Sequence, residues 1–438
     1  MIMFSHLHGI HTPHRKGTNN SPVISMEIPK TVTIPMSMHI GKPAIPIVKV
    51  GDLVKVGTKI GEADGYISSN VYSSVSGKVI KLTDHLLLNG STSTAVVIES
   101  DGEMAFDESV APVNVNNQKE FVEAVKASGI VGLGGAGFPT YVKVDVAPER
   151  IEYLIINGAE CEPYVTSDTV TMLTRTDDMV FALKAFNRYL GVKNVIIGVE
   201  KNNINAVKSM NKMAASISDF SVKVMSLPNV YPQGGEKVLV YHTTGRKILE
   251  NKLPIDVGCI VLNCTTIASI GAYLRTGMPL VEKCVTVEGG AVKQPQNVIA
   301  PIGASISDLF DCCGGLTEQP AKIIYGGPMM GITVLNSDFP IIKNTNAVLA
   351  LTEKEAKLPK TTACIRCGAC VNTCPFGLAP VSIAKAYEKK DAKMLNELSV
   401  QSCMECGCCS FVCPANRPLV QINKMAKEFL KEEAKKEV

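Results

Sequence analysis

The sequence predicts a multi-domain α/β protein, with an N-terminal β module, a parallel α/β domain, a small α+β module and a helical, cysteine-rich domain. Three observations support this prediction. The 438 residues are too many for one ordinary hydrophobic core. Along the chain, glycine-punctuated β-like runs give way to alternating strand and helix patterns. Nine of the 15 cysteines lie beyond residue 360, in a stretch whose apolar residues have helical spacing.

The composition disfavours one class of partner and indicates a compartment. Trp is absent, aromatic residues make up 5% of the chain, and the net charge is +3. These values disfavour single-stranded nucleic acid, whose bases stack on aromatic side chains. Fifteen cysteines without a recognisable signal peptide favour reduced thiols in a cytoplasm over a disulfide framework.

One uncharged apolar stretch, residues 257–274, is long enough to be weighed as a membrane span. It contains Asn263, Thr265, Thr266 and Ser269, which make it a poor span. A buried strand followed by a loop is therefore expected. If the protein works at a membrane, partner subunits have to hold it there.

Residues 1–25 are expected to form an N-terminal tail. They contain four of the seven histidines, namely His6, His8, His11 and His14. A metal site is one interpretation of this group. The histidines lack a regular ligand spacing, however, so a mobile or partner-covered tail is favoured.

Residues 26–104 are expected to form a compact β module. Short runs rich in Val, Ile and Lys alternate with turn glycines such as Gly51 and Gly77. The order VKVGDLVKVGTKIG followed by VYSSVSGKVIKL resembles the barrel-sandwich fold of biotinyl and lipoyl carriers. Those carriers present a modified lysine at a hairpin tip, where this chain has Ser68, Ser69 and Asn70. A docking module is therefore favoured over a swinging arm.

The chain from 118 onward divides into four further parts. After a linker, residues 118–279 are expected to form the parallel α/β domain. Helices are predicted at 119–128, 179–190 and 203–215, and strands at 151–157, 192–199 and 258–263. Residues 280–345, with short strands and paired glycines, form the small α+β module. Residues 352–425 form the helical cysteine-rich domain, and 426–438 a charged tail.

Two copies of one cysteine motif lie in the C-terminal domain. Each has the spacing C-x2-C-x2-C-x3-C-P, and every cysteine recurs 39 residues later. In such a repeat the first three thiolates bind one [4Fe–4S] cubane, and the fourth binds the other. The predicted ligands are Cys364, Cys367, Cys370 and Cys413 for the first cluster, and Cys403, Cys406, Cys409 and Cys374 for the second. Zinc is disfavoured, because it is bound by isolated C-x2-C pairs in closed four-ligand sites.

The other cysteines are interpreted as core thiols. Cys408 lies beside Cys409, but it aligns with Ala369 of the first copy and is therefore expected to be a buried free thiol. The remaining six have no ligand spacing: Cys161, Cys259, Cys264, Cys284, Cys312 and Cys313.

A glycine-rich segment, GLGGAGFPT at residues 132–140, contains a formal G-x-G-x-x-G pattern. In a dinucleotide fingerprint this pattern follows a strand, whereas a predicted helix precedes it here. Glycines nevertheless let the backbone approach a phosphate or a flat ring, and their N–H groups can form an anion-binding nest. A loop that merely turns the chain is the alternative.

Three further polar segments fall where strands end or helices begin. The predicted strand 151–157 runs into NGAECEPY, the segment YPQGGEK opens a helix, and the strand 258–263 ends in NCTT. The carboxyl ends of parallel strands lie at one edge of a sheet, which is where α/β domains bind ligands. Together with the glycine-rich segment, these loops could enclose a nucleotide.

These segments carry a family resemblance. GIVGLGGAGFPT, NGAECEPY, YPQGGEK and VLNCTT resemble the flavin- and NADH-binding subunit of respiratory complex I. With HGIHTPHRK, GGPMMG and the two ferredoxin motifs added, nearly the whole chain resembles the RnfC family of the Rnf ion-translocating electron transport complexes. The stretch that begins VTVEGG resembles the β-grasp module of both families, which assigns that fold to 280–345.

The resemblance implies FMN, two [4Fe–4S] clusters and NAD(H) as substrate, in a membrane complex that couples ferredoxin:NAD⁺ electron transfer to Na⁺ or H⁺ pumping. It places Gly132, Gly134, Gly135, Gly137 and Lys143 at the FMN phosphate and ring, and Asn157, Glu160, Tyr231, Gly234, Asn263 and Thr265 along the flavin. Phe138, Glu162 and Glu236 would face the nicotinamide nucleotide. Ala159 departs from the pattern, because the complex I protein has an acidic residue there.

The expected role is conversion between electron pairs and single electrons. A nicotinamide exchanges a hydride, a cubane passes one electron, and a flavin can do both. No residue is expected to act as an acid or base, because hydride transfer requires only that the rings be held face to face and water excluded.

The expected location is the cytoplasmic side of the cell membrane, as a peripheral subunit held by other subunits of the complex. A ferredoxin-type donor would be reached indirectly. One alternative is a soluble flavin and iron–sulfur reductase, such as a microcompartment cobalamin reductase, although the N-terminal segment and β module argue against it. Another is a non-enzymatic electron-wire subunit with a vestigial flavin pocket.

Overall fold

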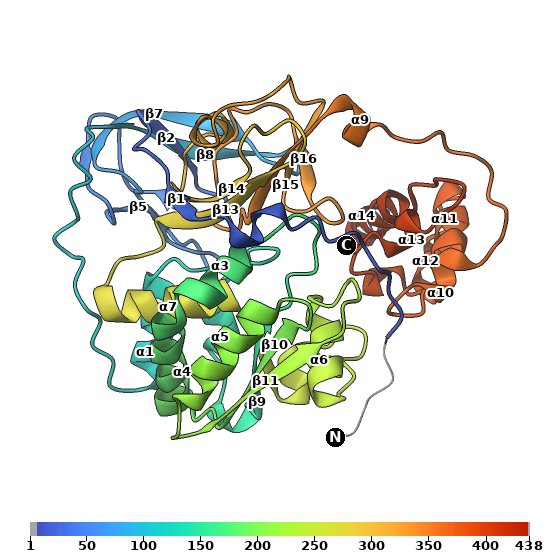
Figure 1. The fold of residues 1–438 in the computed structure, drawn as a ribbon, viewed down its shortest axis with the longest axis horizontal. Coiled ribbons are helices and arrows are strands. Elements are labelled where there is room, and N and C mark those ends of the chain that lie inside the picture. The colour runs from blue at the N-terminus through green and yellow to red at the C-terminus, as the bar shows by residue number, and fades with distance from the viewer. Residues whose placement is uncertain (1–6, 437–438) are drawn as a thin grey trace.

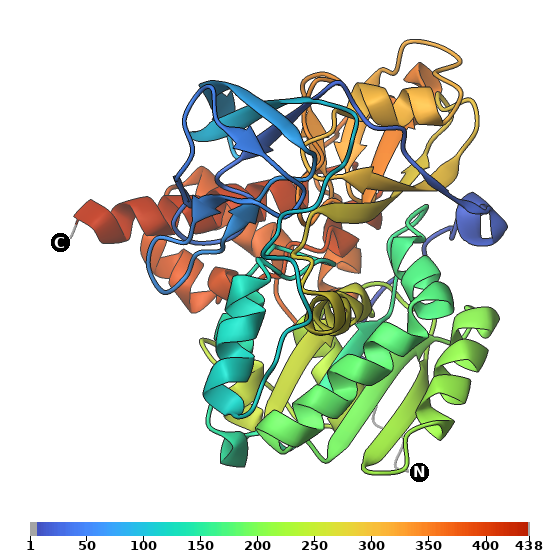
Figure 2. The same cartoon turned by 90° about the vertical axis from the view of Figure 1, so that its left-hand side faces the viewer.

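The computed structural model describes residues 7–436. It has the four folded parts that the sequence predicts. The N-terminal β module and the β-grasp module lie side by side above the parallel α/β domain, and the cysteine-rich domain lies to one side (Figures 1 and 2). A long strand-free connection after helix α9 (Glu353–Ala356) leads into that last domain (Figure 1).

The N-terminal β module consists of two small sheets, as in a barrel-sandwich. One has the order β2 (Thr31–Pro35), β8 (Thr92–Ser100), β7 (Gly77–Leu86) and β4 (Leu53–Val54), and the other β3 (Ile45–Pro46), β5 (Lys59–Glu62) and β6 (Val71–Tyr72). The hairpin tip is buried, and Lys343 donates hydrogen bonds to Oγ of Ser69 and to the carbonyl oxygen of Gly129. The tip is therefore fixed within the chain and is not a swinging arm, and the docking role of the module stays a prediction.

The α/β domain contains a four-stranded parallel sheet. Its order is β11 (Ser221–Leu227), β10 (Asn194–Glu200), β9 (Tyr153–Gly158) and β12 (Cys259–Asn263). The helices are α1 (Gln118–Ala127), α2 (Thr140–Val144), α3 (Ser167–Thr174), α4 (Thr176–Leu190), α5 (Ile204–Ala215), α6 (Glu236–Thr244) and α7 (Cys264–Thr276), with one-turn helices η2 (Pro148–Arg150) and η3 (Pro254–Val257). The helices and strands predicted in this domain are confirmed within two or three residues. The short α2 and α3 and strand β11 have no counterpart among the predictions.

The prediction of a loop after the strand in 257–274 is wrong. The strand β12 is present, but helix α7 begins directly after it. The side-chain oxygen of Asn263 accepts hydrogen bonds from the backbone N–H groups of Thr265 and Thr266, which caps the helix. A Cβ at Gly271 would lie 1.9 Å from the carbonyl oxygen of Asp178, so α7 packs very closely on α4. Because α7 is buried on most sides, it lacks the polar stripe by which a helix is recognised in a sequence.

The β-grasp module contributes most of a six-stranded sheet, in the order β1 (Val23–Ser25), β14 (Gln296–Pro301), β13 (Glu282–Glu288), β17 (Ala347–Leu351), β15 (Lys322–Tyr325) and β16 (Ile332–Val334), with helix α8 (Ile306–Cys312). The sheet therefore continues past the predicted boundary at 345. Its edge strand β1 comes from the segment expected to be a tail.

The described part of that N-terminal segment, residues 7–25, is packed on the rest of the chain. Ile10 is buried and exchanges backbone hydrogen bonds with Tyr231, and a one-turn helix η1 (Gly17–Asn20) precedes β1. The expectation of a mobile or partner-covered tail is therefore wrong for these residues. His11 and His14 contact Asn229 instead of one another, and His6 lies outside the described residues.

The cysteine-rich domain is helical, as predicted. Its helices are α10 (Ala369–Asn372), α11 (Pro380–Glu388), α12 (Ala392–Glu397), α13 (Cys408–Phe411) and α14 (Leu419–Lys436), with a one-turn helix η4 (Val400–Ser402). Helix α14 crosses the predicted boundary at residue 426, and Ala426 and Leu430 are buried in the core of the domain. The described part of the expected tail is thus a structural helix.

Candidate functional site

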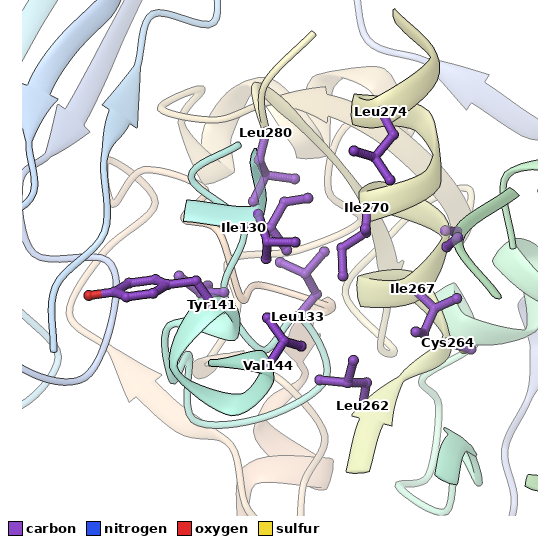
Figure 3. Packing of buried hydrophobic residues seen from close by; sticks show 14 of the residues in the cluster. Ile130, Leu133, Tyr141, Val144, Leu262, Cys264, Ile267, Ile270, Leu274 and Leu280 are labelled. Atoms are coloured by element: carbon purple, nitrogen blue, oxygen red, sulfur yellow. The ribbon is translucent and has the colours of Figure 1, made fainter. Parts of the chain in front are cut away.

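The glycine-rich segment is anchored by apolar packing and lies between α1 and α2, not after a strand. Ile130 just before it, Leu133 at its start and Val144 in α2 pack in one cluster with α7, whereas the ring of Tyr141 points away from α7 (Figure 3). The backbone N–H of Leu133 donates to Oγ1 of Thr266 at 3.0 Å. The fixed ends hold the glycines at the carboxyl edge of the sheet, where β12 ends at Asn263.

The middle of the segment leaves its backbone open to a ligand. Gly134, Gly135 and Ala136 are exposed, and none of their N–H groups donates a hydrogen bond within residues 7–436. A Cβ at Gly134 would lie 2.3 Å from Nδ2 of Asn263, so only glycine allows this close approach. Free, neighbouring N–H groups of this kind suit an anion such as a phosphate.

A buried carboxylate organises the floor beneath these glycines. Asp168 accepts hydrogen bonds from Nδ2 of Asn263 and from Oγ1 of Thr265, both at 2.7 Å. Oγ1 of Thr171 contacts the same threonine at 2.8 Å. The sequence analysis missed Asp168, because its partners lie about a hundred residues away and no spacing pattern connects them.

The opposite wall of the glycine segment is held by residues of the β-grasp module that lie just before β17. Nδ2 of Asn344 donates to the carbonyl oxygen of Gly135 at 2.9 Å, and the neighbouring Lys343 anchors Gly129. Asn344 was also missed, since it lies more than 200 residues from its partner. Ala136, at the tip, borders a cavity of about 710 Å³ between the two β modules.

Glu160 is buried and already engaged by the protein. Its two carboxylate oxygens accept hydrogen bonds from the backbone N–H groups of Asp168 and Thr169 and from Oγ1 of Thr169. Burial raises the pKa of Glu160 to about 7, with nearby Lys16 acting in the opposite direction. The carboxylate therefore caps the start of α3, and its predicted contact with flavin stays a prediction.

Lys143 and Glu236 form an ion pair with each other. The family resemblance assigns Lys143 to FMN and Glu236 to the nicotinamide nucleotide. Nζ of Lys143 lies 2.5 Å from Oε1 of Glu236 and 3.1 Å from the carbonyl oxygen of Val261. Both side chains are partly exposed. The pair brings α2 and α6 together beside the carboxyl edge of the sheet.

The loops after β9 and β11 hold one another. Nδ2 of Asn157 donates to the carbonyl oxygen of Gly234 at 2.9 Å, and the N–H of Gly234 lies 3.4 Å from the sulfur of Cys161. Ala159, the departure from the family pattern, is buried, and its N–H donates to the side chain of Asn157. Phe138 is half-buried at the end of the glycine segment, where its carbonyl oxygen accepts from Gly132.

Tyr231 and Glu162 form hydrogen bonds with residues outside the α/β domain. The hydroxyl of Tyr231 donates to the carbonyl oxygen of Cys406 at 2.7 Å. Glu162 accepts hydrogen bonds from the N–H groups of Met329 and Met330, in the GGPMMG loop, and burial raises its pKa. These two predicted ligand residues therefore join the α/β domain, the β-grasp module and the cysteine-rich domain.

The thiols of the second motif surround a cavity together with a thiol of the first. Cys403, Cys406 and Cys409 line a cavity together with Cys374. Cys408 also lines this cavity, but its thiol lies 3.8 Å from the carbonyl oxygen of Tyr231. Within residues 7–436, no three His, Cys, Asp or Glu side chains converge as ligands of a single metal ion would.

The thiols of the first motif are more open. Cys370 packs with Cys413 in a small apolar cluster around Leu419, so the fourth thiol of the second motif lies with the first. Cys367 is exposed and Cys364 is half-exposed. The exchange of fourth cysteines between the motifs, like the ligand sets themselves, stays a prediction.

Four family models match successive parts of the chain. The RnfC barrel sandwich hybrid domain matches residues 4–103, the Nuo51 FMN-binding domain 125–272, the SLBB domain 284–333 and the 4Fe-4S dicluster domain 360–420. The order and limits agree with the four parts of the structure. The chain therefore has an FMN-binding domain and a dicluster domain.

The curated relatives decide the family. The chain is 41% identical, over 86% of its length and 86% of the relative's, to the RnfC-type subunit of the Na⁺-translocating ferredoxin:NAD⁺ oxidoreductase complex of Acetobacterium woodii. It is 39% identical, over 85% of its length and 82% of the relative's, to the proton-translocating counterpart of Clostridium ljungdahlii. The chain belongs to the RnfC family. The expected family resemblance is confirmed.

A more distant likeness supports the fold of this RnfC family member. An NAD⁺-reducing [NiFe]-hydrogenase in the H2-reduced state matches with a TM-score of 0.50 and 16% identity, over 72% of this chain and 61% of that one. At this identity the likeness supports the arrangement of the domains alone. No helix within residues 7–436 is both long and apolar enough to span a membrane.

Proposed function

We propose that this chain is the peripheral, NAD(H)-reacting subunit of an ion-translocating ferredoxin:NAD⁺ oxidoreductase on the cytoplasmic side of the cell membrane. The observation that carries the proposal is the combination of two sites in one chain, namely an open glycine segment beside Asn263 and a thiol-lined cavity that contacts the same domain. The complex would translocate Na⁺ or H⁺, the two ions named for the relatives.

The glycine segment is proposed to hold FMN. Its free N–H groups and the exclusion of any side chain at Gly134 suit the phosphate and the edge of a flat ring. Asn263, oriented by Asp168, would hydrogen-bond the flavin, and Lys143 in α2 is proposed to meet the FMN as the family resemblance implies. Bound FMN supplies the capacity to exchange a hydride with NAD(H) and to pass single electrons.

The protein's own contribution is positioning. The anchors of the glycine segment, Thr266 on one side and Asn344 on the other, hold its backbone at fixed distances from the sheet edge. The backbone N–H groups of the segment would hold the flavin in place without having to reorganise. Hydride transfer between flavin and nicotinamide requires no proton to move to or from a side chain. Phe138 and Glu236 are the residues proposed to meet the nicotinamide nucleotide beside the flavin.

The thiol sets fit two [4Fe–4S] clusters. Soft sulfur donors in two complete groups of four, with the fourth cysteines exchanged, match the ligand chemistry of paired cubanes. The second cluster would be held by Cys403, Cys406, Cys409 and Cys374, and the first by Cys364, Cys367, Cys370 and Cys413. Both are proposed to relay single electrons.

Anaerobic spectroscopy tests the NAD(H) reaction. Purified protein should carry a yellow flavin, and NADH should bleach it. The Gly134→Asp variant serves as the control, because it should lack the flavin and show no NADH-dependent change. A brown wild-type protein without flavin would contradict the proposal and would favour the electron-wire alternative.

Membrane washing tests the proposed location. High-pH carbonate or a chaotrope breaks protein contacts, and we expect it to release this chain while membrane-spanning subunits stay in the pellet. The control is one of those spanning subunits, probed in the same fractions. Retention of this chain in membranes that lack its partner subunits would contradict a peripheral location.

A further inference from the structure

Residues 7–16 of the N-terminal segment, which we call the strap, contact the loops at the carboxyl edge of the parallel sheet. Ile10 exchanges backbone hydrogen bonds with Tyr231, in the loop after β11. The carbonyl oxygen of His14 accepts a hydrogen bond from the backbone N–H of Tyr164, in the loop after β9, at 3.1 Å. The strap therefore holds two of the loops that were predicted to enclose a nucleotide.

Lys16, the last residue of the strap, reaches into the loop after β9. Its ammonium group donates hydrogen bonds to the carbonyl oxygen of Glu160, at 2.7 Å, and to that of Val165. Burial raises the pKa of three carboxyl groups around it, and the charge of Lys16 opposes that rise at each of them. These groups belong to Glu160, Glu162 and Glu200.

A continuous series of contacts connects this loop to the glycine segment. The carboxylate of Glu160 accepts a hydrogen bond from the backbone N–H of Asp168 at 2.8 Å. Asp168 in turn accepts from Nδ2 of Asn263 at 2.7 Å. The side chain of Asn263 lies so close to Gly134 that a Cβ there would come within 2.3 Å of Nδ2. A change at Glu160 can therefore reach the glycine segment through Asp168 and Asn263.

This arrangement requires Glu160 to be ionised. Its two carboxylate oxygens accept three hydrogen bonds from the start of α3, from the N–H groups of Asp168 and Thr169 and from Oγ1 of Thr169. A protonated carboxyl group has to donate from one oxygen, so protonation disturbs these contacts. Burial raises the pKa of Glu160 to about 7 against the charge of Lys16, and loss of that charge would raise it further.

Three other titratable groups face Glu160. They belong to Asp168 in α3, Cys264 in α7 and Cys284 in β13. Burial raises the pKa of both thiols, that of Cys284 to about 12, so both are neutral near pH 7. The two groups whose charge matters at Glu160 are therefore Lys16 and Asp168.

We propose that Lys16 is a positioning residue of the flavin site, which holds Glu160 ionised and thereby fixes Asp168 and Asn263 beside the glycine segment. This inference rests on the proposed function, because it concerns the site assigned to FMN. FMN affinity should fall as the pH drops and Glu160 takes up a proton. Without the charge of Lys16, the same fall should begin at a higher pH.

The pH profile of FMN binding tests this role. The variant is Lys16→Met, and its matched control is Lys208→Met, which removes the same charge from an exposed position of α5. The full chain, loaded with clusters and freed of flavin, is titrated with FMN between about pH 6.5 and pH 9. Dividing the dissociation constant of each variant by that of wild type cancels the titration of the FMN phosphate itself.

For Lys16→Met, we expect this ratio to be at least about threefold larger near pH 7.5 than near pH 9. Lys16→Arg, which keeps the charge, and the Lys208→Met control should give ratios that do not change with pH. A ratio for Lys16→Met that is the same at every pH would overturn the proposal, because it would show a structural role alone.

A second pair of variants tests whether Lys16 acts through Glu160. Glu160→Gln has no carboxyl group to titrate at this position, so adding Lys16→Met to it should leave the pH profile unchanged. An equal shift of the profile with and without Glu160→Gln would overturn the proposal. Failure of wild type to bind FMN at any pH would instead contradict the proposed function.

Discussion

The thiols of the cysteine-rich domain and the polar groups around the glycine segment differ in how far apart in the chain their members lie. Most thiols of each predicted set come from a single short motif, and only the fourth is predicted to come from the other motif, 39 residues from its counterpart. Around the glycine segment, by contrast, Leu133 meets Thr266, Gly135 meets Asn344, and Asp168 meets Asn263. A site built from local spacing can be perturbed one ligand at a time, whereas a site built from long-range contacts depends on packing between domains.

The largest expected effect is complete loss of flavin binding with both clusters retained. Gly134→Asp places a side chain where a Cβ would already lie 2.3 Å from Asn263, and adds negative charge where a phosphate is proposed. Flavin binding should be abolished, while both clusters assemble. Asn205→Asp is the control, because it adds the same charge at an exposed position of α5. Flavin content and the paramagnetic resonance of dithionite-reduced protein measure both outcomes, and loss of clusters in Gly134→Asp would contradict the independence of the sites.

The exchange of fourth cysteines gives the next effect. Cys374→Ala should damage the cluster built on Cys403, Cys406 and Cys409, because Cys374 lines their cavity. NADH should still bleach the flavin. The control is Cys408→Ala, which should keep both clusters, since this thiol has no counterpart in the first motif. Selective loss of the Cys364 cluster in Cys374→Ala would show that the motifs do not exchange ligands.

Most of the fold and the thiol sets could be predicted from the sequence, because strand and helix periodicity and ligand spacing are local signals. The helix after Asn263 could not, since burial on most sides removes its polar stripe. Asp168 and Asn344 escaped prediction because their partners are set by tertiary packing. Tyr231 and Glu162 were predicted as ligand residues from the family pattern, but they contact Cys406 and Met329.

A moderate effect is expected at the floor of the glycine segment. Asp168→Ala leaves the side chains of Asn263 and Thr265 without their buried acceptor, which typically costs about 1–3 kcal/mol per group. Flavin affinity should fall by about tenfold or more, corresponding to about 1.4 kcal/mol. Asp168→Asn keeps one side-chain oxygen as an acceptor, so its loss of flavin affinity should be smaller. Titration of cluster-loaded protein with FMN measures the affinity, and unchanged binding in Asp168→Ala would remove Asp168 from the site.

A different readout, the pH dependence of stability, concerns Lys343, which donates hydrogen bonds to Ser69 of the N-terminal β module and to Gly129 just before the glycine segment. Burial lowers the pKa of Lys343 to about 7, so the unfolded chain binds more protons than the folded one between about pH 7 and 10.5. Stability should therefore rise with pH across this window, by about 2 kcal/mol between pH 7 and 9. The stability of Lys343→Met, measured by thermal unfolding, should lack this part of the pH dependence. An identical dependence in the two proteins would show that Lys343 is not a buried, titrating lysine.

The central claim is that one chain holds a flavin site and two cubanes. The most direct measurement is the content of anaerobically purified protein, namely flavin, iron and acid-labile sulfide per chain. The account predicts about one flavin and about eight each of iron and sulfide. About four of each, or zinc in place of iron, would contradict the two thiol sets, and absence of flavin beside full clusters would contradict the glycine site.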